Sequence, residues 1–133
     1  MKLSLDRHGE APPTVGPHQR GSNVFDKESG LLQGTVELLV LKTLSWGPMH
    51  GYGIASWIES VTSDALRVEE GSLYPALYRM AGKGWISAEW GLFENNRRAK
   101  FYALTRSGRA RLAQETALWR RVSRAIQLVL RTA

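Results

Sequence analysis

The sequence contains no cysteine and only three histidines among its 133 residues. Without cysteine the chain can form no disulfide and offers no thiolate to a metal. Two of the histidines, His8 and His18, lie in a proline-containing N-terminal stretch, where we expect no fold to hold them around a metal ion. No carboxylate pair or phosphate-cradling glycine loop stands beside a candidate base. We therefore expect no metal, no cofactor and no enzymatic activity.

Long apolar runs are also missing. A helix that spans a bilayer needs about 20 consecutive apolar residues, and no stretch of this chain approaches that length. The first residues, MKLSLDRHGEAPP, lack the apolar segment of a signal peptide. These observations predict a soluble, cytoplasmic protein that does not enter a membrane.

Acidic residues are scarce in the last third of the chain. From Arg97 onward there are ten Lys or Arg residues and one acid, Glu115, which gives a charge of +9. Because the whole chain carries +6, the first 96 residues carry −3. Concentrated positive charge suits a polyanionic partner such as DNA, although a basic helix exposed to solvent gives the same count.

Apolar periodicity predicts two helices in the first half. Residues 1–30 show no periodic apolar pattern and read as a flexible extension. Apolar residues then follow helical spacing from Leu31 to Leu44, before the turn Trp46-Gly47-Pro48. A second amphipathic helix is predicted from Gly51 to about Val61. His50 precedes it and could donate to a phosphate beside the helix N-terminus, or could be a turn histidine without that role.

The stretch Val68–Trp85 predicts a third helix with two different faces. One face is apolar at i, i+4, i+7 spacing and should pack inward. The other presents donors that can reach base edges or phosphates: Ser72, Tyr78, Arg79 and Lys83. Pro75 restricts where the helix begins, because proline is tolerated in the first turn. The helix should start near Gly71 or Ser72, or at Glu69 with a kink; if Ser72 caps it, the hydroxyl is less available to DNA.

After Gly84 the apolar period changes from 3.6 to 2, which predicts two half-buried strands at residues 86–90 and 101–104. Asn95 and Asn96 in the connection suit a turn. The basic residues Arg97, Arg98 and Lys100 lie at or just beyond the tip. A basic hairpin beside a short helix describes a wing that contacts phosphates, and the alternative is a solubilising loop.

Thr105 is a suitable cap for a last helix from Arg106 to about Arg131, which would be about 40 Å long. A heptad-like apolar seam runs along it, interrupted by Glu115. The seam consists of Leu112, Trp119, Val122, Ile126 and Val129. Either the same helix of a second copy or the first helix of the same chain should bury this seam.

These elements predict a mainly α fold with a small two-stranded β-wing. We expect residues 31–105 to form a winged helix-turn-helix DNA-binding domain, residues 106–133 a long C-terminal dimerisation helix, and residues 1–30 the flexible extension. The motifs LLQGTVELLVLKTL, GPMHGYGI, EEGSLYPALYRM, GWISAEWG, ENNRRAKFYALT and GRARL resemble, in order and spacing, the PadR-like transcriptional regulators. The resemblance is to the short type with a single C-terminal helix, and it extends from about Leu31 to the end.

The resemblance implies a homodimeric, sequence-specific DNA-binding regulator, usually a repressor. Its third helix would enter the major groove of a pseudo-palindromic double-stranded operator, and its wing would approach the adjacent backbone or minor groove. The matching positions are Tyr52, Ser72, Tyr74, Pro75, Tyr78, Asn96, Arg97, Arg98 and Lys100. For Tyr74 a phosphate contact and a place at the edge of the core are equally open.

Some members of the family bind aromatic effectors at the dimer interface. Trp119 lies on the seam and could stack on such a molecule, or could simply be part of the interface core. An alternative function for the chain is a protein-interaction module that does not bind DNA and docks through its C-terminal helix.

Overall fold

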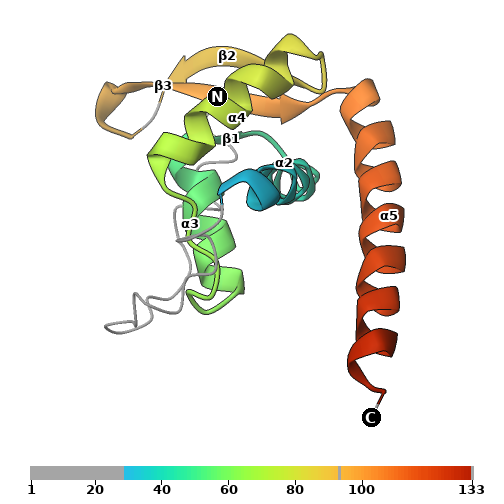
Figure 1. Ribbon diagram of the computed structural model, residues 1–133. Helices are drawn as coiled ribbons and strands as arrows, with labels where there is room; N and C mark the ends of the chain where they lie inside the picture. Colours follow the sequence, from blue (N-terminus) through green and yellow to red (C-terminus); the bar gives the residue numbers. More distant parts are fainter. Residues whose placement is uncertain (1–28, 93, 133) are drawn as a thin grey trace.

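The computed structural model describes residues 29–92 and 94–132. The predicted flexible extension lies outside the described residues except for its last two, which begin a helix. Helices α2 (Ser29–Leu44), α3 (Gly51–Val61) and α4 (Glu70–Gly82) are followed by a hairpin of β2 (Ile86–Leu92) and β3 (Arg98–Leu104), and helix α5 (Arg106–Leu130) comes last. Figure 1 shows α4 lying along the hairpin, while α5 extends as an arm at one side of α2. Among the described helices, none is long and apolar enough to cross a membrane.

The hairpin belongs to a three-stranded antiparallel sheet in the order β1-β3-β2. Strand β1 contains only Met49 and His50, which pair with Tyr102 and Phe101 on β3. The prediction of two strands was therefore correct for β2 and β3 but incomplete. Two residues are too few to show the alternation of period two by which a strand is recognised in a sequence.

The core lies where α2, α3 and α4 meet and where the base of the hairpin covers them. Leu73, Leu77 and Met80 are fully buried, as the spacing in the third helix predicted. They pack with residues of α2 and α3 in one cluster, which includes Val40, Leu41, Ile54 and Ile58. The inner face of α4 is thus committed to the core, and its outer face is fixed in direction relative to the hairpin.

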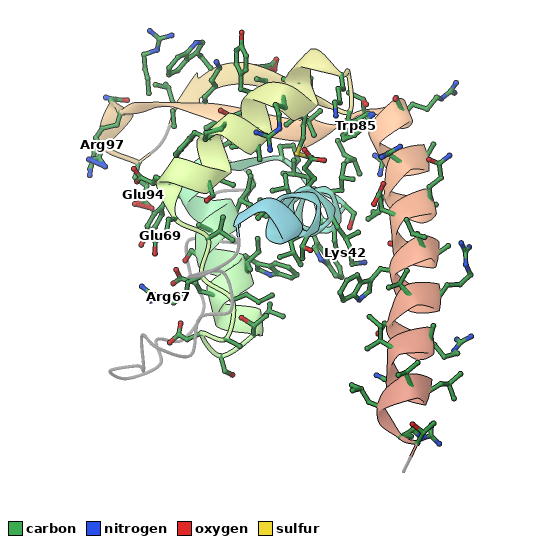
Figure 2. All side chains as sticks on the ribbon, viewed as in Figure 1. Lys42, Arg67, Glu69, Trp85, Glu94 and Arg97 are labelled. Atoms are coloured by element: carbon green, nitrogen blue, oxygen red, sulfur yellow. The ribbon has the colours of Figure 1, made fainter. Side chains whose placement is uncertain are left out.

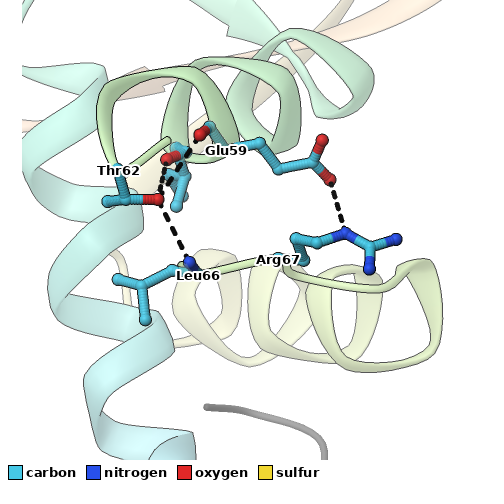
Figure 3. A network of polar contacts seen from close by, with 5 residues as sticks. Glu59, Thr62, Leu66 and Arg67 are labelled. Atoms are coloured by element: carbon cyan, nitrogen blue, oxygen red, sulfur yellow. Dashed lines mark hydrogen bonds and ion pairs between the residues drawn. The ribbon is translucent and has the colours of Figure 1, made fainter. Parts of the chain in front are cut away.

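The connection between α3 and α4 is stabilised by its own polar contacts (Figure 3). The Thr62 hydroxyl donates to the Ile58 carbonyl oxygen at 2.9 Å and accepts from the Leu66 amide at 3.1 Å. The Arg67 guanidinium Nε lies 3.9 Å from a carboxylate oxygen of Glu59. The chain reverses at Ser63 and Asp64, which both have positive φ. These contacts hold the angle at which α4 leaves α3.

Helix α4 begins earlier than the position of its proline predicted. Glu69 is the N-cap residue and Glu70 the first helical residue, so Pro75 lies in the second turn. Of the predicted starts, the one at Glu69 was closest. Pro75 has no backbone N–H to donate to the carbonyl of Gly71, four residues earlier, so one hydrogen bond of the helix is missing there.

The wing is more exposed than predicted. Only Ile86 of β2 is buried, while Ala88 and Trp90 are exposed, so the expectation of a half-buried strand is wrong beyond its first residue. Tyr102 is the one buried residue of β3. The hairpin extends past the helices that cover its base, so Ala88 and Trp90 are not covered by the core.

Helix α5 starts as predicted. Thr105 is its N-cap residue, and the Thr105 hydroxyl accepts from the Gly108 amide at 3.0 Å. The same hydroxyl lies 2.7 Å from the Gly84 carbonyl oxygen and 2.9 Å from that of Trp85, to which it donates. Gly108 is buried against the Trp85 backbone, where a Cβ would overlap the carbonyl group. This junction fixes the start of α5 to the turn between α4 and β2.

Candidate nucleic-acid interface

The outer face of α4 carries exposed side chains with hydrogen-bonding groups. Tyr78 is 83% exposed, and Ser72, Tyr74 and Pro75 are exposed beside it. Because Glu69 occupies the cap position, the Ser72 hydroxyl has no capping role and lies on the exposed face of the helix. The choice between a cap and an outward-facing Ser72 is thereby decided in favour of the outward position.

Two of the predicted donors on this helix lie elsewhere. Arg79 is turned toward α2, where its Nε lies 3.4 Å from a carboxylate oxygen of Glu37. Lys83 lies at the C-terminal end of α4, with its ammonium nitrogen 4.7 Å from the centre of the Trp85 ring. Arg79 is therefore paired with α2, and Lys83 lies just after the last helical residue of α4.

An open cleft of about 550 Å³ lies between the start of α3, the N-terminal half of α4 and the wing. It brings together six of the twelve residues predicted to bind DNA, from three segments of the chain. The lining residues are His50, Gly51, Tyr52, Tyr74, Arg97, Arg98, Ala99, Lys100 and Tyr102. Three cationic side chains and three phenol groups thus surround a space open to solvent, a composition suited to a phosphate backbone.

His50 occupies the inner side of this cleft. It is the N-cap residue of α3, and its Nδ1 accepts from the Gly53 amide at 3.1 Å. The side chain is 8% exposed, and its ring stacks on Tyr52 with centroids 6.2 Å apart. With Nδ1 accepting, the proton of a neutral imidazole is on Nε2. His50 therefore has a structural role as a cap and holds the 73%-exposed Tyr52 ring at the rim.

Tyr74 and Tyr102 join α4 to the sheet at the base of the cleft. Burial, followed by the negative charge of Glu70, raises the pKa of the Tyr74 hydroxyl. Burial, followed by the neighbouring Tyr74, raises the pKa of Tyr102. Both groups stay protonated at neutral pH, so each can donate a hydrogen bond to a phosphate oxygen.

The tip of the wing is a tight turn, Glu94–Asn96, in which Asn95 and Asn96 have positive φ of 64° and 57°. Asparagine tolerates this region better than most residues, as the turn prediction required. Arg97 follows the turn and is exposed, and Figure 2 shows it projecting at the end of the hairpin. Arg98 and Lys100 lie on β3 itself, which starts closer to the tip than the sequence predicted.

The described residues contain no group of three or more His, Cys, Asp or Glu side chains that could hold a metal ion. Acidic residues do lie near the cleft: Glu69 and Glu70 are exposed at the start of α4. Their charges oppose those of the wing, so the cationic part of the interface is confined to the wing side.

The apolar seam of α5 is divided by its surroundings. Leu112 packs against the core, and the first part of α5 contacts α2 and β3. Trp119, Val122, Ile126 and Val129 are 50%, 41%, 51% and 69% exposed. Packing on the chain's own first helix therefore accounts for the start of the seam, and the rest of it is not covered within the part of the chain that the structure describes.

The comparisons with known proteins fit this architecture. The model of the transcriptional regulator PadR-like family matches residues 40–114, more than half of the chain. The chain belongs to this family. The match runs from the C-terminal part of α2 through the first turns of α5, and so contains every residue of the cleft.

Solved structures of PadR-like and related proteins share the fold. A transcriptional regulator from Clostridium thermocellum is 26% identical with a TM-score of 0.68, covering 74% of this chain and 95% of that one. A PadR-like transcriptional regulator from Bacillus cereus is 25% identical with a TM-score of 0.67, covering 78% and 99%. An uncharacterized protein X from Lysinibacillus sphaericus is 26% identical over 102 residues, which are 77% of this chain and 94% of that protein.

The structure adds residues to this PadR-like site that the sequence did not indicate. Tyr102 lines the cleft, and Trp90 lies beneath the cations of the wing, with the Arg98 guanidinium carbon 4.9 Å and the Lys100 ammonium nitrogen 5.7 Å from its ring centre. The sequence indicates Trp90 and Tyr102 only as alternating strand residues. Only the pairing of Trp90 with Lys100 across the hairpin reveals the contact.

Proposed function

We propose that this PadR-like regulator binds double-stranded DNA as a homodimer and represses transcription from a pseudo-palindromic operator. The observation that carries the proposal is the cleft, in which Tyr74 on α4 and the wing cations share one open space. The outer face of α4 would read bases in the major groove, and the wing would contact the adjacent backbone. A regulator that acts on the chromosome would work in the cytoplasm.

The proposed contacts divide into two kinds. Tyr78 and Ser72 are exposed on α4 and would contact base edges, which determines sequence preference. Contacts to phosphates would come from the cleft and the tip of the wing, by Tyr52, Tyr74, Asn96, Arg97, Arg98 and Lys100. Pro75 would shape the exposed face of α4 and contribute apolar contact.

The homodimer rests on the uncovered part of α5. Four apolar residues of the seam are at least 41% exposed, and the same helix of a second copy would cover them in register. Two cleft-bearing domains would then face two half-sites of one operator. If an aromatic effector releases the repressor, we expect it to stack on Trp119 at this interface.

The decisive experiment starts with selection of bound sequences from a random DNA pool, which would define the half-sites and their spacing. Binding of the selected operator is then measured across a salt titration for the wild type and for Arg97→Ala with Arg98→Ala. Losing these phosphate contacts should weaken binding to all sequences and reduce the salt slope by about one to two units.

The matched control removes the same charge elsewhere. Arg120→Ala with Arg121→Ala deletes two adjacent, exposed arginines from α5, away from the cleft. This variant should keep the wild-type salt slope. Equal slopes for all three proteins would show that the wing does not contact phosphates.

The uncovered apolar face of α5 also favours a second function, that of a module which docks on another protein and binds no DNA. Light scattering separates the two. A dimer that selects a symmetric sequence supports the repressor, and a monomer that retains no DNA fragment supports the docking module.

A further inference from the structure

Trp90 is a large aromatic residue in a part of the wing where little covers it. Trp90 is 59% exposed. It lies on β2, directly opposite Lys100 on β3. Arg98, two residues before Lys100, lies on the same face of the hairpin because side chains alternate along a strand. Both cations lie over the Trp90 ring, and both also line the cleft.

We propose that Trp90 is a positioning residue of the wing, whose ring holds Arg98 and Lys100 in the conformations in which they contact DNA phosphates. The inference rests on the proposed DNA-binding function and assigns a role to a residue that touches the DNA only through its neighbours. It concerns how the wing contacts are made, not whether the protein binds DNA.

An aromatic ring suits this task better than a carboxylate would. Long cationic side chains lose rotamer freedom when they bind, which weakens binding unless they are ordered beforehand. A glutamate could order them, but it would neutralise their charge and would have to be displaced by the phosphate. The face of an indole ring attracts a cation and leaves its positive charge available to a second partner.

A purely structural role for Trp90 is disfavoured by its surroundings. The neighbouring Ala88 and Glu89 are exposed, and the buried core of the described residues does not include Trp90. The hairpin is held by backbone pairing from Ile86–Leu104 to Leu92–Arg98. Removal of the ring should therefore leave the fold of the wing and the melting temperature of the protein nearly unchanged.

The chain offers a matched control. Trp46 is also 59% exposed and has a cation over its ring, with the Lys42 ammonium nitrogen 5.5 Å from the ring centre. It does not line the cleft. Trp46→Ala removes the same kind of contact without affecting the proposed interface.

The experiment measures operator affinity for Trp90→Ala, Trp90→Phe and Trp46→Ala. We expect Trp90→Ala to bind about threefold to tenfold more weakly, the range for loss of an exposed cation–π contact and of side-chain order. Trp90→Phe, which keeps an aromatic face, should regain most of the affinity, and Trp46→Ala should bind as the wild type does.

Coupling to the cations is the critical readout. Trp90→Ala is repeated in a protein that already carries Arg98→Ala and Lys100→Ala, where a positioning residue has nothing left to position. The effect of Trp90→Ala should then disappear. If it persists undiminished, Trp90 contacts the DNA itself or supports the fold, and the inference is wrong.

Failure of this inference differs from failure of the proposed function. If Arg98→Ala with Lys100→Ala weakens binding but Trp90→Ala does not, the wing binds DNA and only the role of Trp90 is overturned. If the wild type selects no DNA sequence from a random pool, the proposed function itself fails, and the role of Trp90 fails with it.

Discussion

The ring of Tyr74 lies directly on the backbone of Gly51, so that a Cβ at position 51 would be only 2.7 Å from the ring Cζ. This contact joins the first residue of α3 to the exposed half of α4. It lies at the point where the cleft opens, and any side chain larger than that of glycine at position 51 would require the Tyr74 ring to move.

Gly51→Ala should destabilise the protein by about 1–3 kcal/mol, because the added methyl group overlaps the Tyr74 ring and the ring must leave its packed position. Denaturant unfolding measures the change. Gly34→Ala is the control, since nothing lies within 4 Å of a Cβ at this position in α2. There the alanine should stabilise the helix by about 0.5–1 kcal/mol. Equal effects of the two substitutions would refute the tight contact.

Thr105→Ala should lower the free energy of unfolding by about 1–2 kcal/mol, because the Gly108 amide loses its capping acceptor. The carbonyls of Gly84 and Trp85 also lose the hydrogen bond from the Thr105 hydroxyl, although Trp85 keeps the one from the backbone amide of residue 105. Thermal unfolding checks this, with Thr105→Ser as the control that keeps the hydroxyl. If serine destabilised the protein as much as alanine does, the capping contact would not be the cause.

Arg79→Ala should reduce stability by at most about 1 kcal/mol and leave sequence preference unchanged, because Arg79 faces Glu37 on α2 and its side chain is partly exposed. Tyr78→Ala should change sequence preference and leave stability nearly unchanged, since Tyr78 is exposed on the outer face of α4. Sequence selection and unfolding on both variants test the contrast. A changed operator preference in Arg79→Ala would return this residue to the base-reading set.

Ile126→Glu should convert a dimer to a monomer, because it places a charge in the exposed seam of α5. Light scattering gives the mass. Arg124→Gln changes the net charge by the same amount, and helical spacing places it on the opposite side of α5 from the seam. A dimer that survives Ile126→Glu would exclude the seam as the interface.

Raised pKa values of Tyr74 and Tyr102 predict a loss of stability in alkali. The unfolded state loses the phenol protons near the ordinary pKa of 10.0, before the folded state does. Stability is therefore retained below about pH 10 and declines as the pH rises through the folded values. Unfolding measured at about pH 9 and about pH 11 should show a smaller decline for Tyr102→Phe than for the wild type.

The sequence predicted the helices well because their apolar spacing and end signals are local. Helix α3 has the predicted bounds, α5 begins after the predicted Thr105 cap, and the apolar face of α4 is buried. For α4 the sequence left two starts open, because the preference of proline for the first turn does not exclude the second turn, where Pro75 lies.

Tertiary structure decided the features that depend on residues distant in sequence. Arg79 looked like a base-reading donor on α4, but its partner Glu37 is 42 positions away. The third strand consists of two residues that acquire strand geometry only by pairing with β3. No local pattern can report either contact.

By itself, the sequence determined the order and type of the main elements, the basic last third and the resemblance to PadR-like regulators, because apolar period, charge and motif spacing are properties of the linear chain. Only the fold decided that Tyr52, Tyr74 and the wing cations meet in one cleft, that Ser72 faces outward, and that Trp90 lies under Arg98 and Lys100. These are distances between separate segments, and packing of the core sets them.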